Sequence, residues 1–195
     1  AGKSITSGNY NLYFGHMTGC LTADGIGNIA MGCKALQGNV SADFNVAIGQ
    51  GAGNLIGGGC NVFIGYGAAA SNGTATDNTA AQNVAVGMYA ASAITDGTMN
   101  TLVGSFAGAT LTTGNGNVAL GFAAGCETTT SGYNVYLGDS AGRNMQTGGY
   151  NFAGGYAALH GSGTAADNTG DYNVAIGHKS GCKITSGSYN TFFGI

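Results

Sequence analysis

Apolar and polar positions alternate within a short unit that recurs along the whole chain. The unit reads Asn, apolar, any residue, apolar, Gly, as in NVAIG at 45–49 and again at 173–177. Close variants include NVFIG at 61–65 and NVALG at 117–121. Because the apolar residues are two positions apart, each pentad predicts a short β-strand that ends at a glycine.

The pentads form one regular series. Their step is 17 residues, apart from one step of 16 and two of 22. The two long steps carry similar inserts, NGTATDNTAAQ at 72–82 and SGTAADNTGDY at 162–172. Counting the Asn of each pentad as position 0, the series starts at Asn11, Asn28, Asn45, Asn61, Asn83, Asn100, Asn117, Asn134, Asn151, Asn173 and Asn190.

A unit of this length cannot bury a core by itself, but stacked copies can. The sequence therefore predicts one all-β domain over 1–195, a parallel β-solenoid of about eleven stacked 17-residue coils, with longer coils at 61–82 and 151–172. Each coil is expected to hold two short extended pieces joined by Gly-rich turns. Helices are not expected, because glycine makes up 39 of 195 residues and no window has a helical period.

The stacking assigns a role to each pentad position. We expect the recurrent Asn side chains to form a hydrogen-bonded ladder between coils. The Gly at +4 should turn the corner with positive φ. The apolar residues at +1 and +3, such as Val46 and Ile48, are expected to face the interior.

Strand alternation then directs position +2 outwards. This position carries no charged residue, and its members include Tyr13, Ala47, Phe63, Leu102, Tyr136 and Phe192. Because monomeric proteins rarely expose a long apolar stripe, this column is the expected interface with other copies of the chain. The alternative is a flattened coil in which +2 contacts a neighbouring turn.

The N-V-A-I-G…A-G…T-x-G pattern resembles the head repeats of trimeric autotransporter adhesins, the YadA-like head, and similar arrays in phage tail fibres and bacterial surface proteins. The likeness covers nearly the whole chain. It implies a left-handed β-roll and a trimer packed through apolar faces. The chain differs from that family in its longer period, its inserts and its cysteines.

The two ends of the chain are near copies, KSITSGNYNLYFG at 3–15 and KITSGSYNTFFG at 183–194. Either the chain is an excerpt of a longer array or copies stack head to tail into a filament. Only 7% of the residues are charged, and the net charge of −3 comes with no basic stripe, which argues against nucleic-acid binding. No apolar run is long enough for a membrane helix, so membrane insertion is not expected.

The sequence predicts no catalytic residues, no cofactor and no metal site. Five cysteines are too far apart in the array for intrachain disulfides and are expected to be reduced and buried, with interchain bridges as the alternative. The three histidines fall at separate positions. Asp77 and Asp167, in matching inserts, are expected to cap turns rather than to pair in an active site.

Tyrosine recurs at position −1, which predicts a stacked ladder or, alternatively, an aromatic strip that contacts glycans or a receptor. Its members are Tyr10, Tyr133, Tyr150, Tyr172 and Tyr189. The leading hypothesis is a non-enzymatic extracellular fibre or adhesin at a cell surface, self-associated as a trimer or filament. A phage tail-fibre segment on a virion that recognises a host glycan is the second. An ice-binding solenoid, suggested by short threonine columns such as Thr112 and Thr129, is the third.

Overall fold

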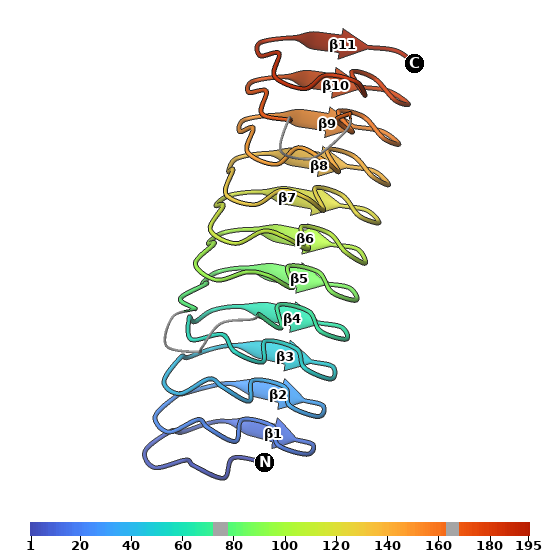
Figure 1. Ribbon diagram of the computed structural model, residues 1–195. Helices are drawn as coiled ribbons and strands as arrows, with labels where there is room; N and C mark the ends of the chain where they lie inside the picture. Colours follow the sequence, from blue (N-terminus) through green and yellow to red (C-terminus); the bar gives the residue numbers. More distant parts are fainter. Residues whose placement is uncertain (72–77, 163–167) are drawn as a thin grey trace.

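The chain folds into a single stack of short strands joined by turns (Figure 1), as seen in a computed structural model that describes residues 1–71, 78–162 and 168–195. Every pentad forms one three-residue strand. The eleven strands are β1 (Leu12–Phe14), β2 (Ile29–Met31), β3 (Val46–Ile48), β4 (Val62–Ile64), β5 (Val84–Val86), β6 (Thr101–Val103), β7 (Val118–Leu120), β8 (Val135–Leu137), β9 (Phe152–Gly154), β10 (Val174–Ile176) and β11 (Thr191–Phe193).

All strands belong to one parallel sheet in chain order, from β1 to β11. The register places each pentad directly over the next, for example Val46 beside Val62 and Ala47 beside Phe63. The predicted parallel solenoid is thus confirmed, and the described residues contain no helix. The expectation of a second extended piece in each coil is wrong, since outside the eleven strands the described residues form turns, bends and irregular backbone, with an isolated parallel bridge between Ala81 and Thr98.

The asparagine ladder is confirmed along the whole stack. The backbone N–H of Asn28 donates to Oδ1 of Asn11 at 2.8 Å, and the same bond recurs up to Asn190, whose N–H donates to Oδ1 of Asn173 at 3.0 Å. The side-chain amide also reaches a turn carbonyl, as in the 3.0 Å bond from Asn117 Nδ2 to Ser131 O. The ladder therefore ties each strand both to its neighbour and to the returning turn.

The corner glycines at +4 have φ between +114° and +143°, as predicted. Their backbones also approach the next coil closely. A β-carbon at Gly138 would lie 2.8 Å from the carbonyl carbon and oxygen of Gly155. Only glycine satisfies both the backbone angle and the contact.

The predicted orientation of the strands is wrong. The central residue of each strand, at +2, points into the coil, and the +1 and +3 residues point out. The physical reason is that the ladder Asn is buried, and alternation places position +2 on the same side as position 0. The proposed interface residues are therefore core residues: Ala47, Phe63, Leu102 and Tyr136 are at most 1% exposed, and Tyr13 and Phe192 are half-buried against the core.

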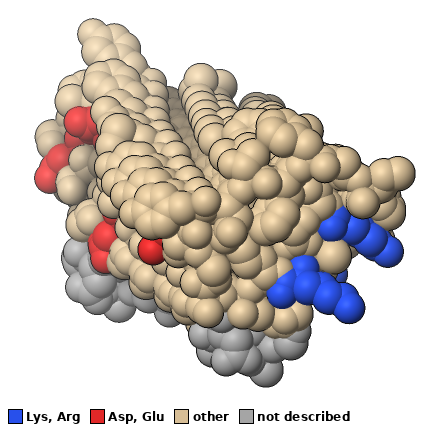
Figure 2. Space-filling view, turned by 90° about the horizontal axis from the view of Figure 1, so that it is seen from above, with Lys and Arg blue, Asp and Glu red and all other residues tan. Residues whose placement is uncertain are grey.

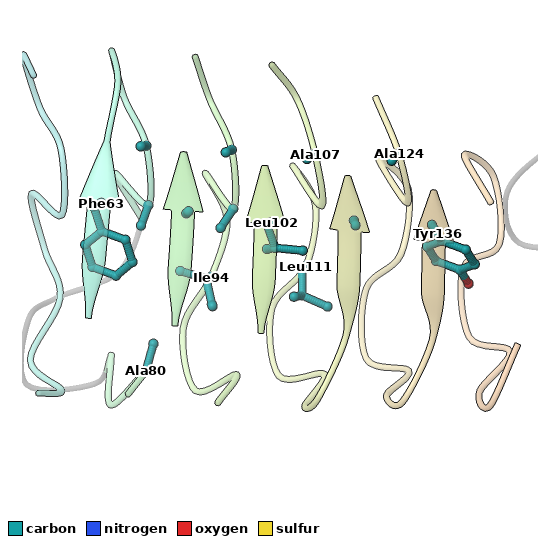
Figure 3. Packing of buried hydrophobic residues seen from close by; sticks show 14 of the residues in the cluster. Phe63, Ala80, Ile94, Leu102, Ala107, Leu111, Ala124 and Tyr136 are labelled. Atoms are coloured by element: carbon teal, nitrogen blue, oxygen red, sulfur yellow. The ribbon is translucent and has the colours of Figure 1, made fainter. Parts of the chain in front are cut away.

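The core is a narrow column inside the coils. Figure 3 shows Phe63, Leu102 and Tyr136 projecting from their strands into the interior, where Ile94 and Leu111 also lie. Alanines fill most of the remaining core positions, such as Ala107 and Ala124 at 0% exposure. Small residues dominate because each coil leaves little room between its strand and its turns.

One core hydroxyl has no partner in the part of the chain that the structure describes. Tyr136 is 1% exposed, and its OH group meets no partner with hydrogen-bond geometry there. Burial raises the pKa of this phenol well above its usual value, although the nearby Thr128 side chain acts to lower it. Phe63 and Phe192 occupy the same +2 position in other coils, so the site accepts a phenyl ring.

We therefore expect Tyr136→Phe to increase the free energy of unfolding by about 1 kcal/mol, since it removes a buried polar group and no bond. Chemical denaturation followed by circular dichroism measures the change. A loss of stability of similar size would contradict this account of the hydroxyl.

Candidate functional site

The outer face of the sheet is a long apolar surface that runs over all eleven strands. It consists of the +1 and +3 side chains of all eleven strands, which we call the sheet face. Apart from Thr101, Thr191 and Gly154, every residue of this face is aliphatic or aromatic. Its exposed large members are Phe193 (72%), Phe14 (70%), Leu12 (55%), Leu120 (40%), Ile176 (40%), Met31 (39%), Ile48 (38%), Ile29 (37%) and Val103 (36%).

The sheet face replaces the +2 column as the candidate interface. It is broader than the predicted stripe, because each strand contributes two outward residues instead of one. Stacked strands repeat about every 4.8 Å, so the face presents its side chains in two regular columns. Because contiguous exposed apolar surfaces are typical of interaction sites, the sheet face is the candidate interaction site of the molecule.

Four of the five tyrosines at −1 form a stacked ladder, as the first of the two interpretations predicted, whereas Tyr10, which is 91% exposed, lies outside it. Tyr133, Tyr150, Tyr172 and Tyr189 have ring centroids 5.2, 4.9 and 4.9 Å apart, with interplanar angles of 14°, 3° and 6°. The rings are also exposed, between 46% and 77%. Their faces are covered by one another, so the ladder presents ring edges and hydroxyl groups to solvent. Limited burial and the neighbouring phenols raise the pKa of Tyr172.

A second aromatic row follows the corner glycines at +5 and +6. It contains Tyr66, Tyr89, Phe106 and Phe122, with successive centroids 5.2, 5.7 and 6.1 Å apart. Farther along the stack the ring of Tyr156 lies parallel to that of His178, at 5.2 Å and 16°.

Charged side chains gather on opposite sides of the rod (Figure 2). Lysines and the arginine lie on the turns after the strands, at +6, +9 or +10 of their coils, as in Lys34, Arg143 and Lys179. Asp24 and Asp171 lie on the turns that lead into the next strand. Within the described part of the chain, no group of three or more His, Cys, Asp or Glu is placed to hold a metal ion.

The aspartates on the incoming turns cap backbone and hydroxyl groups of neighbouring coils. Oδ1 of Asp24 accepts from the Ser7 hydroxyl at 2.7 Å and the Thr6 hydroxyl at 2.9 Å, and these bonds hold the pKa of Asp24 below its usual value. Oδ1 of Asp171 accepts from the Gly149 N–H at 2.7 Å. Asp77 and Asp167 lie outside the described residues.

All five cysteines are free. The expectation that they are buried is wrong: Cys60 is exposed, and Cys20, Cys33, Cys126 and Cys182 are half-buried, because all five lie on turns or bends near the surface. Burial raises the pKa of the Cys126 thiol. His16 approaches a cysteine, with Nδ1 3.9 Å from Sγ of Cys33.

The threonine columns hold the turns together. The Thr112 hydroxyl donates to the Thr129 carbonyl at 3.2 Å, and the Thr129 hydroxyl donates to the Gln146 carbonyl at 3.3 Å. The hydroxyl protons of Thr112 and Thr129 are thus engaged between coils, whereas Thr113 and Thr130 of the neighbouring threonine column are exposed.

No protein-family model matches the chain, and no curated protein or solved structure is significantly similar to it. In the part of the chain that the structure describes, no helix has the length and apolar character to cross a membrane.

Proposed function

We propose that this protein is a non-enzymatic, extracellular structural protein whose solenoids pack laterally through their sheet faces into a fibre or filament. The observation that carries the proposal is the exposed apolar sheet face, which continues over all eleven strands without a charged residue. The resemblance to surface adhesin heads and tail fibres points in the same direction.

A second copy of the same chain is the partner that best fits this face. Its side chains are spaced by the strand repeat of about 4.8 Å, and another sheet face has the same spacing. Two such faces can pack at about 10 Å with interdigitated side chains, as stacked sheets do. The face carries no charge that would repel an identical surface.

End-to-end contact is the second part of the proposal. At each step of the stack, the N–H of one ladder Asn donates to Oδ1 of the Asn before it. A second copy placed beyond β11 would set its Asn11 over Asn190 and continue both the ladder and the sheet. The flanking segments at 3–15 and 183–194 are near copies, so the new step would join similar coils.

The lateral contact is tested by placing charge on the sheet face. Val103 and Leu120 lie on neighbouring strands and are 36% and 40% exposed. The double variant Val103→Lys/Leu120→Lys should fold normally, because neither side chain is buried. We expect it to sediment as a monomer in analytical ultracentrifugation, whereas the parent chain sediments as an oligomer.

A matched control places the same two charges on the same two coils but away from the sheet. Thr113 and Thr130 are exposed turn residues of these coils. Thr113→Lys/Thr130→Lys should leave the oligomer intact. An unchanged oligomer in the sheet-face variant, or a monomeric parent chain, would contradict the proposal.

Glycan recognition is the alternative function, and the tyrosine ladder is a poor site for it. Sugars pack their C–H faces on aromatic rings, and the ladder uses its ring faces for stacking. A different surface of the solenoid, formed by coils near the C-terminus, suits a saccharide better.

A further inference from the structure

Three consecutive coils form a hollow on the turns that follow β8, β9 and β10. Its volume is about 490 Å³. The lining comes from positions +5 to +11 of the three coils and includes Ser140 and Arg143, then Tyr156 and His160, then Lys179 and Lys183. No residue of the sheet face or the tyrosine ladder contributes to it.

The hollow concentrates positive charge in an acidic protein. Three of the five Lys and Arg residues of the chain line it: Arg143, Lys179 and Lys183. All three side chains are exposed, and within the described residues none forms an ion pair. Figure 2 shows basic side chains gathered on one side of the rod.

The other titratable groups leave this charge largely uncompensated. Nδ1 of His160 lies 3.0 Å from the Gly161 carbonyl and donates to it, so Nε2 is left for another partner. Asp139 lies at the rim, where its Oδ1 accepts from the Ser140 hydroxyl at 2.6 Å. Glu127 is on the coil before Arg143 and does not line the hollow. Among the described residues, the three cations therefore have Asp139 at the rim and Glu127 beside Arg143, whose carbonyl accepts from the Glu127 N–H at 2.8 Å, as their acidic neighbours.

One wall of the hollow is aromatic. Tyr156 is 50% exposed, and one face of its ring is stacked on His178. On the preceding coil the equivalent position is Asp139, so no aromatic ring covers the opposite face. This differs from the row of Tyr66, Tyr89 and Phe106, where ring follows ring.

We propose that this hollow binds an anionic saccharide, with a carboxylate or sulfate group held by Arg143 and Lys179 and the sugar ring against Tyr156. The guanidinium of Arg143 suits bidentate pairing with either oxyanion. A small inorganic anion would leave most of the volume and the aromatic wall unused. The inference gives the glycan-recognition alternative a site and a ligand class, and it is independent of the filament role.

Isothermal titration calorimetry tests the proposal with four probes: a sulfated heparin disaccharide, an unsulfated uronic-acid disaccharide, neutral cellobiose and inorganic sulfate. We expect at least one acidic disaccharide to bind about tenfold or more tightly than either cellobiose or sulfate, because only it uses both the cations and the ring. Binding of the sulfated disaccharide alone would identify the bound group as a sulfate, and binding of the unsulfated uronic-acid disaccharide would identify it as a carboxylate.

Matched variants locate the binding. The double variant Arg143→Ala/Lys179→Ala should bind the acidic disaccharide about tenfold or more weakly than the parent chain does, since charge-assisted bonds are lost. Lys34→Ala removes a lysine from the same +6 position of another coil and should change nothing. Tyr156→Ala should lower the affinity for the disaccharide and leave the affinity for sulfate unchanged. Tyr66→Ala, at the same +5 position of another coil, is its control and should change neither affinity.

Two results would overturn the inference. One is affinity for inorganic sulfate equal to that for both disaccharides, with no effect of Tyr156→Ala. The other is acidic-disaccharide binding that survives Arg143→Ala/Lys179→Ala. Titrating the Val103→Lys/Leu120→Lys variant, in which the hollow is intact, separates failure of saccharide binding from failure of assembly.

Discussion

Gly138→Ala should lower the free energy of unfolding by about 3–5 kcal/mol, because it combines backbone strain with a steric clash. Gly138 has φ of +129°, a conformation that residues with a side chain rarely adopt. The new methyl group would also lie 2.8 Å from the carbonyl carbon and oxygen of Gly155 on the next coil. Neither contact can relax by rotation of a side chain, since both partners are backbone.

Urea denaturation followed by circular dichroism measures this loss. Gly51→Ala is the control, because Gly51 has φ of +69° and open space where the β-carbon would be. The same +6 position carries Lys34 at φ +61° in another coil, so side chains are tolerated there. We expect the control to lose only about 1 kcal/mol. Equal losses of stability for the two variants would show that the close approach of the next coil does not limit which residue fits at the corner position.

Asn117→Asp should be the second severe substitution, with an expected loss of about 3–5 kcal/mol at neutral pH. Nδ2 of Asn117 donates to Asn100 Oδ1 at 3.1 Å and to Ser131 O at 3.0 Å. An ionised aspartate can donate neither bond and places its charge against those two acceptor oxygens. The position is only 2% exposed, so water cannot compensate.

The effect of Asn117→Asp should depend on pH. Burial against acceptor oxygens raises the pKa of the new carboxyl above its unfolded value of about 3.9. The folded variant therefore holds its proton more tightly, and the loss of stability relative to the parent should be smallest below pH ~4 and grow as pH rises through the folded pKa.

Asn9→Asp is the control, because Asn9 is exposed and donates only to Ser7 O at 3.0 Å. It should change stability by no more than about 0.5 kcal/mol, with little dependence on pH. An Asn117→Asp variant as stable as this control would contradict a structural role for the ladder.

The sequence predicted those features of the fold that every coil needs for itself. Asn117 and its equivalents recur because each coil must satisfy the same amide and carbonyl groups. Gly138 and its equivalents recur because each corner needs the same backbone angle. Requirements repeated at every step are visible as a period.

The orientation of the strands could not be derived from alternation alone, which separates two faces without saying which is inside. Residue size contained the missing information. Leu36 and Leu159 occupy position +8 where their own coil and the next coil both have Ala at +2, whereas Gly108 packs on Leu102 and Gly142 on Tyr136. A β-carbon at Gly108 would lie 2.9 Å from the Leu102 side chain. Such compensation between positions +2 and +8 indicates that both point into one narrow core.

The charged hollow could not be predicted from the sequence for a different reason. Arg143 belongs to one coil and Lys179 and Lys183 to another, and the three residues occupy different positions of the repeat, +9, +6 and +10. They do not share a position of the repeat, and the sequence around each of them indicates only a cation on the surface. Only the stacking of coils brings them to one cavity with Tyr156.

Electron cryo-microscopy of the purified native particle tests the central claim most directly, which is that identical solenoids assemble through their sheet faces. We predict rods with an axial strand spacing of about 4.8 Å, in which neighbouring rods meet through the side chains at +1 and +3. Isolated single rods, or rods that meet through other surfaces while the sheet face stays in solvent, would contradict the account.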